Sequence, residues 1–82
     1  MNDTILCAVQ EGPGRLSVTT LATEAQALSD YLRDKGINVS EVGPRKSGAF
    51  GQTRMPQWVR QFTADTNIES LAELSANWAD GI

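Results

Sequence analysis

The chain has 82 residues, of which 40% are hydrophobic and 21% charged, so we expect a single folded domain over residues 1–82 and exclude a wholly disordered chain. Its net charge of −3 provides no general attraction for nucleic acid or for an anionic membrane. With no histidine and one cysteine, Cys7, the chain excludes an internal disulfide and a structural zinc site, and it lacks the commonest general base.

Two strand signals occupy the first twenty residues. Thr4–Gln10 is rich in apolar residues, and Arg15–Thr19 alternates polar with apolar side chains. Glu11–Gly14 between them is typical of a turn, so either the two segments pair as a hairpin or only one of them is a regular strand. Cys7 stands between Leu6 and Ala8, which predicts a small buried side chain within the first strand.

A helix is predicted to follow, opening at Thr23 and closing before Gly36. Thr23 and Gln26 have the spacing of a capping box, in which both side chains bond to free amides of the first turn. Glycine suits the left-handed position just after a helix, which places the end of the helix at Gly36. The expected buried stripe is Ala25, Leu28 and Leu32, with Tyr31 beside it.

The remaining elements are predicted to be one strand and two helices. Ile37–Val42 reads as a strand with Ile37 and Val39 toward the first helix. Pro56–Thr63 reads as a helix, because proline is favoured in a first turn and Trp58, Val59 and Phe62 then share a side. A capping box at Thr66–Glu69 opens the last helix, whose stripe is Ile68, Leu71, Leu74 and Trp78. We therefore expect an α+β fold, with two or three strands packed against about three helices.

The sequence contains no recognisable set of catalytic residues, so we expect that the protein is not an enzyme. The acid pairs Asp30/Asp34 and Glu69/Glu73 lie one helical turn apart, but such pairs on exposed helix faces are usually solvated. We therefore assign no catalytic, cofactor-binding or metal-binding residue. The sequence also has neither a signal peptide nor a long apolar run, which favours a cytoplasmic protein without a membrane partner.

Positive charge is concentrated in the middle of the chain. Val42–Ala64 contains four basic residues and no acidic one, whereas the other 59 residues have ten acidic and three basic residues, a balance of −7. Gly43–Gln52 is predicted to be an irregular, glycine-rich loop that joins a strand to a helix and exposes an aromatic side chain. Arginine and aromatic residues are enriched where proteins meet. We therefore predict a partner-binding patch formed by Arg45, Lys46, Phe50 and Arg54.

Three segments of the chain follow a pattern known from a family of bacterial proteins. Leu28–Arg33 has a leucine-aromatic-leucine-basic order, Ser47–Gly51 a glycine-hydrophobic-glycine order, and Leu71–Trp78 is a leucine- and alanine-rich segment that closes on tryptophan. Together they resemble the effector-associated constant component family. The resemblance implies a non-catalytic adaptor that recruits an effector in a bacterial conflict or defence system through protein contacts. It implies no catalytic residues.

The leading hypothesis is therefore a protein–protein adaptor whose basic segment meets an acidic partner or a second copy of the chain. A small phage-type inhibitor of a defence system fits the size and acidity equally well. An anion- or nucleotide-binding module is a third hypothesis, because glycines let backbone amides converge on phosphate, although Gly43–Gly48 lacks the order of a P-loop. Nucleic acid is disfavoured because four basic residues make few phosphate contacts.

Overall fold

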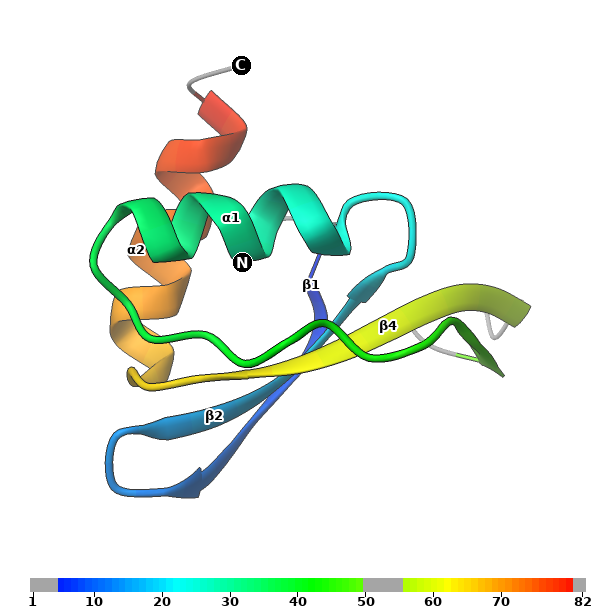
Figure 1. Cartoon of the computed structure of the whole chain (residues 1–82), viewed down its shortest axis with the longest axis horizontal. Coiled ribbons are helices and arrows are strands. Elements are labelled where there is room, and N and C mark those ends of the chain that lie inside the picture. Colours follow the sequence, from blue (N-terminus) through cyan, green and yellow to red (C-terminus); the bar gives the residue numbers. More distant parts are fainter. Residues whose placement is uncertain (1–4, 50–55, 81–82) are drawn as a thin grey trace.

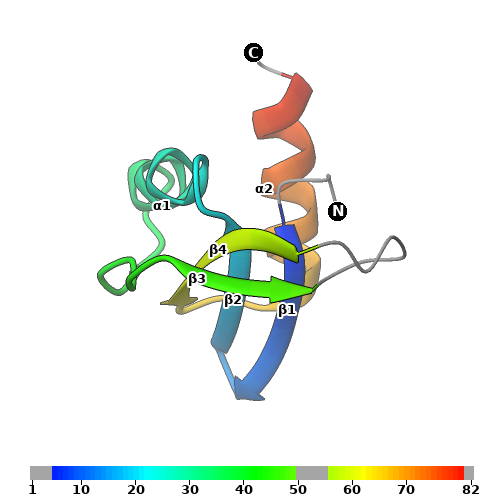
Figure 2. The same ribbon diagram turned by 90° about the vertical axis from the view of Figure 1, so that its right-hand side faces the viewer.

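The fold is an antiparallel sheet with both helices on one side (Figures 1 and 2). The computed structural model describes residues 5–49 and 56–80. The strands follow the order β1-β2-β4-β3 across the sheet. In chain order the elements are β1 (Ile5–Gly12), β2 (Arg15–Leu21), α1 (Ala25–Asp34), β3 (Lys46–Ala49), β4 (Pro56–Ala64) and α2 (Ile68–Asp80). The predicted α+β class is confirmed, with two helices in the described residues and not about three.

The first two strands pair as a hairpin, which was one of the two predicted alternatives. Gly14 in the turn has a φ of 72°, a left-handed conformation that glycine adopts without strain. β2 lies inside the sheet and directs Leu16 and Val18 into the core. Because Ala8 lies opposite Val18, its neighbour Cys7 falls on the face away from the core. Cys7 is exposed, so the prediction of a buried cysteine is wrong.

Helix α1 has the predicted inner stripe of Ala25, Leu28 and Leu32, all fully buried. Its end is also confirmed: Gly36 has a φ of 85°, and the Ile37 amide donates to the Leu32 carbonyl at 3.1 Å. The start of the helix differs from the prediction. The Glu24 amide already donates to the Leu21 carbonyl in a turn, so the N-cap falls on Glu24 and not on Thr23.

Helix α2 begins at a different cap from the one predicted. The Asn67 side-chain oxygen accepts from the Ser70 amide at 2.8 Å, so Asn67 is the N-cap, one residue after Thr66. Leu71 is fully buried, and Leu74 and Trp78 pack against the core as expected. Ile68 is 41% exposed, so it does not belong to the buried stripe that was predicted for this helix.

We expect Asn67→Ala to lower the free energy of unfolding by about 1 kcal/mol, because the variant removes the side-chain cap from the first turn of α2. Thr66→Ala is the matched control and should change stability by less than about 0.5 kcal/mol. Urea unfolding followed by circular dichroism measures both variants. Equal losses would contradict the assignment of the cap to Asn67.

The segment predicted as a helix over Pro56–Thr63 is strand β4, and this is the main correction to the predicted fold. Phe62 lies opposite Val18 and Ala64 opposite Leu16, so these side chains complete the core between sheet and helices. The local pattern permits both structures, because Val59 and Phe62 have helical spacing while Trp58, Phe62 and Ala64 fit alternation. The segment forms a strand because it pairs with β2 on one side and with β3 on the other. Pro56 is compatible with this structure, since proline is tolerated at the first residue of a strand.

The connection from α1 to β3 runs along the free side of β4. The predicted strand over 37–42 forms only one isolated bridge, between Val39 and Ala64, and the Gly43 amide then donates to the Gln61 carbonyl at 2.8 Å. Val39 is buried in the core as expected. The predicted loop over 43–52 contains strand β3 and leads to a second strand, so its description as an irregular strand-to-helix connection is wrong.

Candidate functional site

The candidate site lies on the end of the sheet that extends beyond α1 (Figure 1). There, Lys46–Ala49 pairs with Pro56–Val59; we call these paired segments the β3–β4 ribbon. The ribbon carries Lys46, and Arg45 immediately precedes it. The other two predicted contact residues, Phe50 and Arg54, lie outside the described residues.

Trp58 is the dominant apolar side chain of the described ribbon. It is 57% exposed, although the sequence predicted it to share a helix side with core residues. The Arg45 guanidinium lies over the Trp58 ring, 5.0 Å from its centroid. This distance is within the range of a cation–π contact, which contributes about 0.5–1 kcal/mol at an exposed site. The contact joins a predicted site residue to one that sequence reasoning missed.

Lys46 occupies the other face of the ribbon. It lies opposite Val59, whereas Trp58 lies opposite Ser47, and residues directly opposite each other share a face of a sheet. Lys46 is exposed and takes part in no hydrogen bond or ion pair found among the described residues. Arg45 and Lys46, both predicted contact residues, are neighbours in sequence. Their side chains lie on different faces of the ribbon and therefore do not form one charged cluster.

The fourth basic residue of the middle segment, Arg60, has a structural role. Its Nε donates to the Gly43 carbonyl at 2.7 Å, and its Nη2 donates to the Val42 carbonyl at 3.3 Å. Arg33 from α1 donates similarly to the Ser40 carbonyl at 2.9 Å. These two arginines satisfy carbonyls of the irregular segment before β3.

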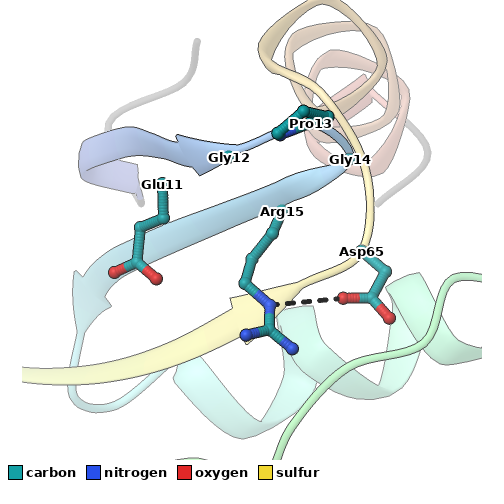
Figure 3. A pocket seen from close by; sticks show the side chains of 6 residues that line it. All are labelled: Glu11, Gly12, Pro13, Gly14, Arg15 and Asp65. Atoms are coloured by element: carbon teal, nitrogen blue, oxygen red, sulfur yellow. Dashed lines mark ion pairs between the residues drawn. The ribbon is translucent and has the colours of Figure 1, made fainter.

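A hollow of about 560 Å³ lies at the other end of the sheet, beside the β1–β2 turn (Figure 3). Arg15 and Asp65 face each other across it, with 3.9 Å between Nε and Oδ1. Asn38 also donates to Asp65, at 3.1 Å. Both charged side chains are largely exposed and already have partners, so the hollow offers no unpaired buried group to a ligand. It is lined by Glu11, Gly12, Pro13, Gly14, Arg15 and Asp65.

The chain has no histidine, and the Cys, Asp and Glu side chains of the described residues form no group of three that could hold a metal ion. Cys7 lies beside Val9 on the sheet face away from the core, and Gln61 on the same face donates to the Thr19 hydroxyl at 3.1 Å. Over β1, β2 and β4 that face has hydroxyl, amide and aliphatic groups, and Lys46 of β3 lies on it at the edge of the sheet.

Neither α1 nor α2, the helices of the described part, is long and apolar enough to cross a membrane. Comparison of the chain with protein-family models, with curated proteins and with solved structures gives no match in any of the three. The resemblance to the effector-associated constant component family therefore stays a prediction.

Proposed function

We propose that this chain is a non-catalytic protein-binding adaptor of the cytoplasm, and that its contact surface is the β3–β4 ribbon. The observation that carries the proposal is the exposed Trp58 beneath Arg45. Tryptophan and arginine are the residues most enriched among those that dominate binding energy between proteins. Burying the Trp58 ring in the interior would stabilise a domain with such a small core. The ring instead lies exposed on the β3–β4 ribbon.

The energetics of Trp58 favour a partner that covers it. A tryptophan side chain offers roughly 200 Å² of surface, and about half of that is in contact with water here. At about 25 cal/mol per Å², its burial against a partner gains about 2–3 kcal/mol. Arg45 and Lys46 add long-range attraction for an acidic partner, which raises the rate of association more than the final affinity.

The alternatives have less support. An anion nest needs converging backbone amides, whereas Gly48 lies in an extended strand paired with Gln57. Nucleic acid would meet repulsion from the −7 balance of residues outside the middle segment. The family resemblance implies an effector protein of a bacterial defence system as the partner, and that assignment forms part of the proposal.

The proposal is tested by capturing partners from the source cells with the tagged chain and measuring the purified partner's affinity. Trp58→Ala should weaken binding at least tenfold, because it removes the ring that the partner covers. Val9→Ala is the matched control: Val9 is 53% exposed but lies on the opposite face of the sheet, so affinity should change less than twofold. A partner that binds Trp58→Ala as tightly as the wild type would overturn the proposal.

Reversing both charges with Arg45→Glu and Lys46→Glu should slow association and make its rate less dependent on salt. Surface plasmon resonance at two salt concentrations measures both effects. The control Arg15→Glu changes a charge at the far end of the sheet and should leave the rate nearly unchanged.

A further inference from the structure

The arginines of the described residues differ in how their N–H groups are used. Arg60 donates to two carbonyls, Arg33 donates to Asp30 and to the Ser40 carbonyl, and Arg15 faces Asp65. Arg45 is the exception among these four, because no hydrogen bond or ion pair within the described part of the chain involves its guanidinium. Within that part of the chain the Arg45 guanidinium lies over the Trp58 ring, with its Cζ 5.0 Å from the ring centroid.

A guanidinium that lies over an aromatic ring remains available for hydrogen bonding. The contact with the ring uses the positive charge of the group, and the five N–H donors of Arg45 have no hydrogen-bond acceptor among the described residues. The contact with Trp58 also restricts the long Arg45 side chain, which lowers the entropy cost of binding. Two parallel N–H donors match the two oxygens of a carboxylate, and such a pair is stronger than a contact with a point charge.

We infer that Arg45, supported by Trp58, is a preformed fork for a carboxylate of the partner protein. The inference rests on the proposed function and adds the chemistry that the ribbon recognises: an aspartate or glutamate side chain, or a chain terminus, next to an apolar surface that covers Trp58. Lys46, on the other face of the ribbon, contributes attraction at long range and not this geometry.

A carboxylate fits the surroundings better than a polyphosphate does. Duplex DNA presents one negative charge for roughly every 1.7 Å of its axis, so bound nucleic acid would extend over the rest of the molecule. The residues outside Val42–Ala64 have a balance of −7 and would repel it. A single carboxylate on a protein surface requires positive charge only where it binds.

The experiment uses the ¹⁵N-labelled chain and three probes: a blocked peptide of alternating glycine and glutamate, its glutamine counterpart, and an eight-residue oligothymidylate. The glutamate peptide should shift the Arg45 Nε–H and Trp58 indole N–H signals, and the glutamine peptide should not. Arg45→Lys keeps the charge but removes the fork, and should weaken binding of the glutamate peptide about fivefold. Lys35→Ala is the control for loss of a cation, because Lys35 also lies over a ring, that of Tyr31, at 5.4 Å.

Equal binding by the wild type and Arg45→Lys would overturn the inference, since charge alone would then explain the attraction. Tighter binding of oligothymidylate than of the glutamate peptide would overturn it in favour of a nucleic-acid partner. The two proposals fail separately when Arg45→Lys is also tested on the captured partner. If Trp58→Ala loses affinity and Arg45→Lys does not, only the inference about the carboxylate is overturned. If neither variant loses affinity, the proposal that the ribbon is the contact surface is overturned as well.

Discussion

Replacing Leu28 with alanine should lower the free energy of unfolding by about 2–5 kcal/mol, a larger loss than we expect from the other variants proposed. Leu28 is fully buried in the middle of the inner stripe of α1, where that helix packs over the sheet. The variant loses both the transfer free energy of the removed methyl groups and the contacts around the cavity that remains. A domain of this size has a total stability of about 4–12 kcal/mol, so the loss is a large fraction.

Ile68→Ala is the matched control for Leu28→Ala. Ile68 is also a branched aliphatic residue in a helix, but it is 41% exposed at the start of α2, so its truncation should cost less than about 1 kcal/mol. Urea unfolding monitored by tryptophan fluorescence and by circular dichroism measures both variants. Similar losses for the two would show that α1 does not form the centre of the core.

Arg60→Met should have the second largest effect, a loss of about 1.5–3 kcal/mol. Methionine retains an apolar stem but cannot donate to the Val42 and Gly43 carbonyls, which the half-buried guanidinium now satisfies. Because these carbonyls belong to the irregular segment before β3, its attachment to β4 should weaken first. Hydrogen exchange should therefore accelerate at the Gly43 amide, which donates to the Gln61 carbonyl.

Arg15→Met provides the comparison for Arg60→Met. Arg15 forms one exposed ion pair with Asp65, and such pairs contribute about 0–1 kcal/mol. Its loss should leave exchange at Gly43 unchanged. If both variants lost equal stability, the hydrogen bonds from Arg60 to the connecting segment would not stabilise the fold.

The structural role of Arg60 bears on how the charge pattern is interpreted. The sequence places four basic residues in one stretch that lacks acidic residues. Nothing in their order distinguishes a residue that stabilises the fold from one that contacts a partner. The structure separates them by their partners: Arg60 bonds to backbone carbonyls, while Arg45 lies on Trp58 with its donors unused by the described residues. The surface that we propose therefore consists of Arg45 and Trp58, with Lys46 on the other face of the ribbon.

Local signals were sufficient for about half of the fold. The inner stripe of α1 and the glycine that ends α1 were predicted correctly, and the β1–β2 hairpin was one of two predicted alternatives. Alternation, helical spacing and a left-handed glycine depend only on neighbours in sequence. The cap of α2 was missed by one residue, since Thr66 and Asn67 are both good cap residues and the spacing of a glutamate favoured the wrong one.

What only the tertiary structure decided is the state of Pro56–Ala64 and, with it, the candidate site. The sequence of this segment fits both a helical and an alternating pattern. It forms a strand because β2 and β3 provide hydrogen-bond partners on its two sides. Once the segment is a strand, Trp58 and Val59 occupy opposite faces, and the ring lies beside Arg45 at the end of the sheet. By itself the sequence determined the α+β class and the position of the positive charge along the chain. Which of those charges bonds to backbone carbonyls and which remains exposed depended on pairing between distant strands, because no local pattern encodes it.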